Sequence, residues 1–287
     1  MPTVHANGID IHYLVLGEGK PGTSLVMTHG FAGPSEQWLP ELEPLAEKRP
    51  VVVYDVRGHG KTSVPQDVES YSMPVFAADL ASLLGKIGIE RAHIGGVSMG
   101  GMVTAQFAVD YPAMCESVLI IDSTCGNTTG ESPFARWEER LGQGIGTLAH
   151  LVARDGLRNT VLREEEWRKA NDPHRDVTPY SLEDDLRRIE MMTVPGYLGA
   201  AHAISTRPDL TSGITSITAP TLVMIGEWDD FLPCAQRDHD LIPGSRLVVR
   251  ERCGHGSRWR AETFVSEIEA FLADVEAGRP VAGERRI

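Results

Sequence analysis

The sequence predicts an α/β fold in which a mostly parallel sheet carries helices on both faces. Short apolar runs alternate with segments whose apolar residues recur at helical spacing, as in successive βαβ units. The run 51–55 is almost continuously apolar, which is typical of a parallel strand buried on both faces. The alternation stops after Asp122 and resumes at Pro220, so both ends of the chain contribute to one sheet.

The elements before Asp122 follow from local signals. Val4 to Leu16 is expected to form a hairpin, because Asn7-Gly8 is a favoured two-residue turn between alternating apolar residues. A helix is expected at 72–87, where apolar residues recur at helical spacing. The remaining expected elements are strands at 24–28, 51–55, 92–95 and 117–122, and helices at 36–48 and 102–108.

From about Gly126 to Gly213 the chain is charged and favours helices, and we expect no strand there. The sequence therefore predicts a core domain of residues 1–125 and 214–287 with a helical lid, 126–213, inserted between its halves. The expected lid helices lie within 134–140, 163–170 and 182–192. In the second half of the core we expect strands at 220–226 and 246–250, helices at 234–241 and 262–273, and a loose tail from Gly278.

Composition limits the classes of function. The 287 residues carry a formal net charge of −13, which argues against binding to nucleic acid or to anionic membranes. No apolar run is long enough to span a bilayer, and the N-terminus lacks the pattern of a signal peptide. The four cysteines do not have the spacing of a zinc site or a disulfide scaffold. We therefore expect a cytoplasmic protein without metal or organic cofactor, either a monomer or a homodimer.

The segment Gly96-Val97-Ser98-Met99-Gly100 follows an apolar run and precedes a helical pattern. A serine between two glycines at a strand-to-helix turn is typical of a nucleophile, because the tight turn exposes its hydroxyl group. The glycines allow the strand and the helix to approach each other closely. The N-terminus of the helix directs N–H groups towards negative charge at the site. The alternative is an ordinary helix start with Ser98 as its N-cap.

A serine nucleophile requires a base, and His255 is the best-placed histidine. It lies in a glycine-flanked loop just after the strand expected at 246–250, at the edge of the sheet where active-site loops gather. His29 and His59 also follow expected strands, so they remain competitors at this point. The other seven histidines have no such placement.

The base in turn requires a carboxylate that holds its tautomer and stabilises the imidazolium. Asp229 follows the strand expected at 220–226, and the chain order Ser98, Asp229, His255 is that of nucleophile-elbow hydrolases. Asp230 is its neighbour in sequence, and Asp122 at the end of an earlier strand is a second structural alternative.

Acyl transfer also requires hydrogen-bond donors for the oxyanion. The expected donors are the backbone N–H of Met99, directly after the serine, and that of Phe31 in the loop following the strand at 24–28.

Taken together, these motifs resemble those of the α/β-hydrolase family. The matching segments occur in family order and are distributed over both ends of the chain, regions that make up about two thirds of it. They are 28–31, 54–63, 96–101, 219–226, 229–233 and 253–255. The resemblance implies a sheet of eight strands with a lid after the sixth, Ser98 as nucleophile, His255 as base and Asp229 as acid, and a structural role for His59. Segment 194–204 is similar to one in 3-oxoadipate enol-lactonases and related esterases.

We therefore expect a serine hydrolase of the carboxylesterase or lactonase type that acts on a small-molecule ester or lactone. One alternative is a carbon–carbon bond hydrolase of ring-cleavage products, and another is a non-catalytic receptor for a small ligand. Large apolar side chains in the lid and in nearby loops are candidates to line the substrate pocket, although each could equally serve in packing. These candidates are Trp38, Trp137, Trp167, Met191, Met192, Tyr197 and Trp228.

Overall fold

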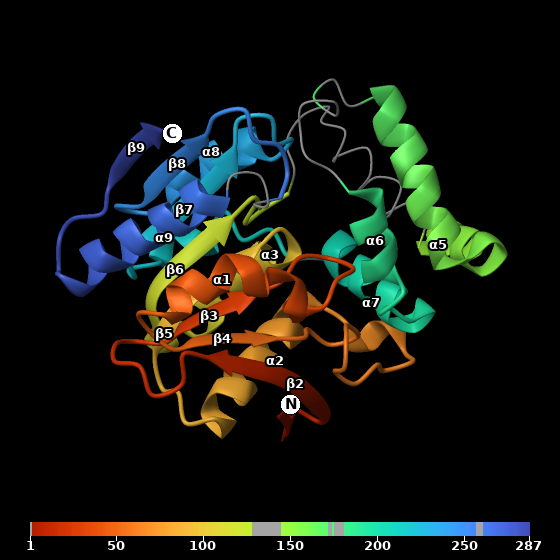
Figure 1. Ribbon diagram of the computed structural model, residues 1–287, viewed down its shortest axis with the longest axis horizontal. Helices are drawn as coiled ribbons and strands as arrows, with labels where there is room; N and C mark the ends of the chain where they lie inside the picture. The colour runs from red at the N-terminus through yellow and green to blue at the C-terminus, as the bar shows by residue number, and fades with distance from the viewer. Residues whose placement is uncertain (1, 128–144, 172–173, 175–180, 257–260) are drawn as a thin grey trace.

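The computed structural model describes residues 2–127, 145–171, 174, 181–256 and 261–287. They contain a nine-stranded sheet in the order β1-β2-β4-β3-β5-β6-β7-β8-β9 (Figure 1). The β1–β2 and β2–β4 pairs are antiparallel, and every other neighbouring pair is parallel. The predicted α/β class with a mostly parallel sheet is therefore confirmed.

The strands are β1 Thr3–Ala6, β2 Ile9–Leu16, β3 Leu25–Thr28, β4 Val51–Tyr54, β5 Ala92–Val97, β6 Cys115–Ile121, β7 Thr221–Gly226, β8 Arg246–Arg250 and β9 Gly283–Arg286. The α-helices are α1 Leu39–Ala46, α2 Met73–Lys86, α3 Met99–Asp110, α5 Ile145–Asn171, α6 Leu182–Ile189, α7 Val194–Ser205, α8 Leu232–Leu241 and α9 Ala261–Glu276. Short 3-10 helices are η1 Ser35–Trp38, η2 Val68–Ser70, η3 Pro112–Met114 and η5 Gly213–Ser216.

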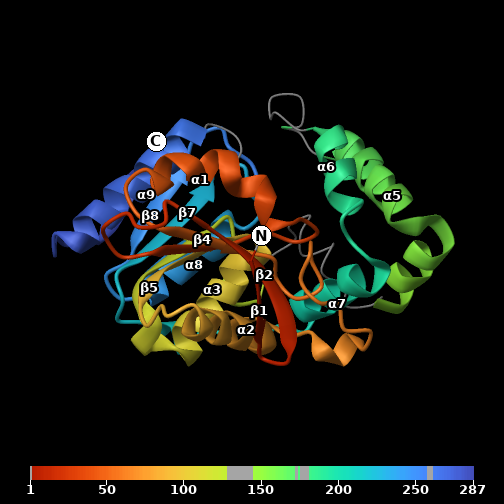
Figure 2. The ribbon, with the colours of Figure 1, turned by 60° about the horizontal axis from the view of Figure 1, so that its bottom comes forward.

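Two helical layers cover the sheet, with α1 and α9 on one face and α2, α3 and α8 on the other (Figure 2). Successive residues of a strand serve the two layers in turn because side chains alternate across a sheet. In β7, Leu222 and Met224 pack with α1 and α9, whereas Val223 and Ile225 pack with the opposite layer. Burial on both faces explains why the central strands are continuously apolar.

The predicted hairpin is present as β1 and β2. Asn7 and Gly8 connect the two strands with φ angles of 49° and 77°. These positive values belong to the type I′ turn, whose twist matches that of the flanking strands. The Asn-Gly dipeptide therefore determines the register of the first strand pair.

The chain leaves the sheet after β6 and returns to it at β7. The described residues of this insertion form α5, α6 and α7, which lie together beside the carboxyl edge of the sheet (Figure 1), and they contain no strand. Gly156 interrupts α5 with φ 77° and ψ 163°, so the segment is two helices joined at a kink. The helix expected at 134–140 lies outside the described residues.

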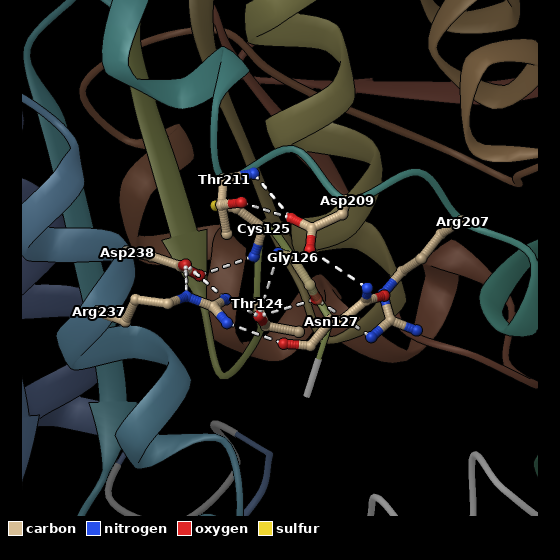
Figure 3. Close-up of polar contacts among 9 residues, drawn as sticks. All are labelled: Thr124, Cys125, Gly126, Asn127, Arg207, Asp209, Thr211, Arg237 and Asp238. Atoms are coloured by element: carbon tan, nitrogen blue, oxygen red, sulfur yellow. Dashed lines mark hydrogen bonds and ion pairs between the residues drawn. The ribbon is translucent and has the colours of Figure 1, made fainter. Parts of the chain in front are cut away.

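A polar network ties the two ends of the insertion to the core (Figure 3). We call it the stem clasp, and it consists of Thr124, Cys125, Gly126, Asn127, Arg207, Asp209, Thr211, Arg237 and Asp238. From α8, Arg237 donates from Nη2 to Thr124 Oγ1 over 3.0 Å and from Nη1 to Asn127 O over 2.8 Å. The buried Asp238 accepts from the N–H of Cys125 at 2.7 Å. The outgoing stem is thereby fixed to α8.

The returning stem contacts the outgoing stem directly. Arg207 Nη2 donates to Gly126 O over 3.2 Å, and Asn127 Nδ2 donates to Asp209 Oδ2 over the same distance. The chain therefore leaves and re-enters the core at one point, where side chains from three segments meet.

The C-terminal tail is the clearest departure from the sequence prediction. Residues 283–286 were expected to be loose, but they form β9, which pairs with β8 and brings the sheet to nine strands rather than eight. All four residues of β9 are exposed, so the segment has no apolar alternation by which to predict a strand. Its position follows from the free edge of β8, whose backbone groups require partners, and from Val281, which is buried.

Candidate functional site

Ser98 occupies the turn between β5 and α3 in a strained conformation, with φ 57° and ψ −120°. Non-glycine residues rarely adopt positive φ, and such strain persists only where the surroundings impose it. Here the N–H of Ser98 donates to Ile121 O over 2.9 Å, and Ser123 Oγ donates to Ser98 O over 2.7 Å. The backbone of the neighbouring strand and a side chain from the segment that follows it thus hold the turn in place.

The flanking glycines are required by the close approach of the backbone. A Cβ on Gly96 would lie 2.2 Å from Gly100 O, and one on Gly100 would lie 2.1 Å from Thr28 O. Any side chain at either position would separate β5 from α3 or α3 from β3. The sequence motif is therefore a packing requirement that also exposes the serine hydroxyl group.

The structure brings Ser98, Asp229 and His255 together although they are distant in sequence. Ser98 Oγ lies 2.9 Å from His255 Nε2, and His255 Nδ1 lies 2.9 Å from Asp229 Oδ2. The other carboxylate oxygen of Asp229 accepts from the N–H of Phe231 over 2.9 Å, and the carboxylate is fully buried. The Asp229 carboxylate is therefore fixed in orientation, and His255 joins it to the serine.

The competing histidines are turned away from the serine. The buried His29 accepts from the N–H of Val56 at Nε2 over 2.9 Å and contacts Gly30 O through Nδ1 at 2.7 Å. His59 is fully buried, and its Nδ1 contacts Arg57 O at 3.1 Å. Burial lowers the pKa of His29 below its ordinary value and lowers that of His59 to about 3. Both rings hold the loops after β3 and β4.

The competing carboxylates also have other positions. Asp122 is fully buried and accepts from Arg250 Nη2 at 3.0 Å, whereas Asp230 is exposed. Burial raises the pKa of Asp122, and the Arg250 guanidinium opposes that rise. Of the three candidate acids, Asp229 is the one in hydrogen-bond contact with His255.

Opposing effects act on the protonation of His255. Removal from water is the largest single effect and lowers its pKa, but the charge and hydrogen bond of Asp229 together with nearby carboxylates raise the pKa to about 9. The carboxylates of Asp122 and Asp230 add to the rise. The ring is 42 % exposed, so solvent screens part of the attraction. The acidic surroundings therefore favour the imidazolium form.

The two expected oxyanion donors are the backbone N–H groups of Met99 and Phe31. Met99 is the first residue of α3, so its N–H has no acceptor within the helix. The loop of Phe31 comes close as well, since a Cβ on Gly30 would lie 3.5 Å from Ser98 Cβ. Ala32 has φ 59°, which turns the loop sharply after Phe31. Both predicted donors thus belong to segments adjacent to the Ser98 side chain.

The predicted pocket residues lie in different parts of the structure. Tyr197 is buried and contacts Phe31, with ring centroids 4.7 Å apart, and Met192 belongs to the same apolar cluster. Met191 is 40 % exposed. Trp38 packs beside Phe264 in the layer of α1 and α9.

Of the other tryptophans, Trp228 stacks on His174 with centroids 4.1 Å apart. Trp137 and the side chain of Trp167 lie outside the described residues.

An apolar cluster joins the insertion to the loop after β3, and we call it the bridging cluster. Its residues are Phe31, Ala32, Val152, Leu157, Val161, Leu182, Leu186, Ile189, Met192, Tyr197 and Leu198. Because Phe31 carries one of the expected oxyanion donors, the position of that donor depends on packing against the insertion.

In the described part of the chain, one group of side chains has the spacing of metal ligands, namely His239, Asp240 and Glu284. It lies near the C-terminus of α8 and beside the start of β8, at the edge of the sheet opposite Ser98. It therefore takes no part in the site around the serine. No helix among the described residues combines the length and hydropathy needed to cross a membrane.

Two residues near the site were not predicted. Ser123 holds the carbonyl group of Ser98, and Arg250 pairs with Asp122. Arg250 carried a signal in the sequence, because it ends the otherwise apolar run Leu247-Val248-Val249. A charged residue at the end of a buried strand requires a partner, and only the sheet order identifies that partner.

Comparison with known proteins places this geometry in context. A family model described as alpha/beta hydrolase fold matches residues 23–259. A putative 2-succinyl-6-hydroxy-2,4-cyclohexadiene-1-carboxylate synthase of Bacillus subtilis is 30% identical over 265 residues, covering 89% of this chain and 92% of that protein. A 2-hydroxy-6-oxononadienedioate/2-hydroxy-6-oxononatrienedioate hydrolase of Pseudomonas putida is 31% identical over 273 residues, covering 92% of each protein.

Among solved structures, a thermophilic esterase from Thermogutta terrifontis superposes with a TM-score of 0.76 at 26% identity. The match covers 95% of this chain and 97% of that one.

Proposed function

Because the chain belongs to the alpha/beta hydrolase fold family, we propose that it hydrolyses carboxylic esters or lactones of small molecules through Ser98, His255 and Asp229. The proposal depends on one observation, the continuous contact from Asp229 Oδ2 through His255 to Ser98 Oγ, with both distances 2.9 Å. An acid, a base and a hydroxyl group in this order can activate the hydroxyl as a nucleophile.

In the proposed mechanism Ser98 Oγ attacks the substrate carbonyl while His255 accepts its proton. The N–H groups of Met99 and Phe31 stabilise the tetrahedral oxyanion. Asp229 stabilises the imidazolium, which then protonates the leaving alkoxide and leaves an acyl-enzyme on Ser98. His255 next activates a water molecule that releases the acid and regenerates the serine. Every step uses side chains or backbone groups of this chain.

The insertion is proposed to act as a lid that provides an apolar binding surface. Tyr197 and Met192 belong to the bridging cluster beside the proposed oxyanion loop, so they are the best-supported candidates to contact substrate. The cluster also stabilises the fold. A Tyr197→Ala variant that alters selectivity between short and long acyl chains would support the binding role, whereas unchanged selectivity would leave only packing.

Carbon–carbon bond hydrolysis is the second candidate, and the Pseudomonas putida relative favours it because that relative is a hydrolase of an oxo-dienedioate. The same three side chains could serve either reaction. A substrate panel separates the two candidates: aryl esters of graded acyl length, several lactones and a vinylogous 1,5-diketone. Hydrolysis of the diketone alone would overturn the ester proposal.

Ser98→Ala is the matched variant for every substrate, since it removes one oxygen atom from the site. We expect its rate to approach the uncatalysed background and its labelling by a fluorophosphonate probe to disappear. A wild-type protein that reacts with neither the panel nor the probe would contradict catalysis and favour a ligand receptor.

A further inference from the structure

Beneath the proposed catalytic residues lies an ion pair that the proposed mechanism leaves unused. Arg250 Nη2 donates to Asp122 Oδ2 over 3.0 Å and lies 3.3 Å from Oδ1. The side chains of Asp122 and Arg250 are 0 % and 1 % exposed. Asp122 directly follows β6, and Arg250 ends β8, so the pair spans the carboxyl end of β7 between them.

The pair is connected to the loop that carries Asp229. Asp122 Oδ1 accepts from the N–H of Gly226, the last residue of β7, over 3.2 Å. Gly226 O in turn accepts from the N–H of Asp229 over 3.1 Å. The backbone of Gly226 therefore links the buried carboxylate to the backbone of the proposed acid.

The pair is also connected to the loop that carries His255. Arg250 O accepts from the N–H of Glu227 over 2.9 Å, and Cys253 O accepts from the N–H of Trp228 over 2.8 Å. A Cβ on Gly226 would lie 2.4 Å from Cys253 O, so the two loops are in close contact. The ion pair thus lies where the loop that carries Asp229 and the loop that carries His255 meet the sheet.

A buried ion pair contributes little net stability, because removing two charges from water costs free energy and apolar residues of similar volume often stabilise a fold equally well. Its location gives it a second effect. Asp122 places another negative charge behind Asp229, where little water screens it, and this charge acts on His255. His255 contacts Ser98 and Asp229 directly, and the carboxylates of Asp122 and Asp230 also act on its protonation.

We infer that Asp122, held by Arg250, is a positioning residue of the proposed acyl-transfer site. It fixes the loop of Asp229 through Gly226 and supplies a second carboxylate that favours the imidazolium of His255 in the transition state. The ion pair with Arg250 favours the ionised form of this buried carboxylate. The inference rests on the proposed function for its catalytic consequence, but the electrostatic effect on His255 can be measured without any substrate.

The test follows the ring signals of His255 by NMR titration of the protein labelled with ¹⁵N-histidine, with His255→Gln to assign the signals. Asp122→Asn keeps the shape and the acceptor for Gly226 but removes the negative charge and leaves that of Arg250. We expect the pKa of His255 to fall by about one unit. Asp122→Asn/Arg250→Met removes both charges, and we expect a smaller fall of roughly half a unit.

Asp79→Asn is the matched control. Asp79 is equally buried and paired with Arg57, at 2.7 and 2.8 Å, but Arg57 follows β4, four places from β7 in the sheet. At ~4.8 Å per strand this control is roughly 19 Å away. It disturbs a buried ion pair without changing the charge near His255. We therefore expect His255 in this variant to titrate with the same pKa as in the wild type.

The inference is overturned if a folded Asp122 variant titrates like the wild type, or if Asp79→Asn shifts the pKa of His255 as much as Asp122→Asn. If Asp122→Asn does not fold, the double variant decides, because neutral replacement of both partners avoids a lone buried charge. Fluorophosphonate labelling then tests the catalytic consequence, with a several-fold slower rate expected for Asp122→Asn. A wild type that is not labelled would count against the proposed function and leave the titration result unaffected.

Discussion

At the scale of single residues, orientation distinguishes side chains that have similar places in the sequence, just after a strand. Asp122, Asp229 and Asp230 all follow strands that end at the same edge, yet one is paired with Arg250, one contacts His255 and one is exposed. The same holds for His29 and His59, which are buried between loops. Hydrogen-bond partners determine which of these groups can exchange protons with a substrate.

The first prediction concerns the proposed acid. Asp229→Asn preserves shape but cannot stabilise the imidazolium, so we expect kcat/KM for an aryl ester to fall by about 10⁴-fold. Asp230→Asn is the matched control, since it changes the adjacent exposed carboxylate and should cost less than about threefold. Similar losses in both variants would contradict the role given to Asp229.

The second prediction concerns pH. His255 must be neutral to accept the proton of Ser98, and attraction to Asp229 raises its pKa from 6.5 to about 9. Activity should therefore rise with pH as the imidazolium loses its proton. Because solvent screens part of the attraction, we expect the midpoint of this acidic limb between 6.5 and 9 in a profile of kcat/KM. A midpoint below 6.5 would show that the acidic surroundings do not control the base.

At the scale of elements, the close approach of α3 to β5 and β3 requires glycine on both sides of Ser98. The third prediction is that Gly100→Ala costs at least ~3 kcal/mol in free energy of unfolding, because its Cβ would lie 2.1 Å from Thr28 O. Gly85→Ala in α2 is the control, since its Cβ meets no atom within 4 Å. That variant should gain about 0.5–1 kcal/mol from helix propensity. Urea denaturation measures both changes, and equal effects would refute the packing explanation.

The fourth prediction concerns the stem clasp. Arg237→Met removes the hydrogen bonds to Thr124 and Asn127, so the outgoing stem should open more often. We expect amide exchange at 124–127 to accelerate by about tenfold, since hydrogen bonds to charged groups contribute about 1.5–3 kcal/mol.

Arg246→Met provides a comparison for the clasp. It breaks contacts to Val281 and Asp274 at the opposite edge of the sheet. We expect it to leave exchange at 124–127 unchanged. Acceleration in both variants would indicate general destabilisation instead of local release.

At the scale of the whole molecule, the C-terminus completes the sheet. The fifth prediction is that removal of residues 281–287 lowers Tm by about 5–10 °C, because it exposes the edge of β8 and the pocket of Val281. Val281→Ala should produce part of this loss. An unchanged Tm for the truncated chain would show that β9 contributes nothing to stability.

The sequence alone determined the class of the fold, the order along the chain of strands β1 to β8, and the turn that presents Ser98. Each of these depends on neighbours a few residues apart, such as the alternation in β2, the apolar runs of the parallel strands and the glycines around the serine. The spacing of residues within short stretches of sequence was therefore sufficient to predict these features.

The tertiary structure alone decided which partner Arg250 has and that residues 283–286 form a strand. These outcomes depend on the order β6-β7-β8-β9, which places side chains more than 100 residues apart within hydrogen-bond distance. A short polar segment such as β9 shows no periodicity of its own, since its structure comes from the strand beside it. Contacts between distant segments arise only when the sheet is assembled, and no local pattern records them.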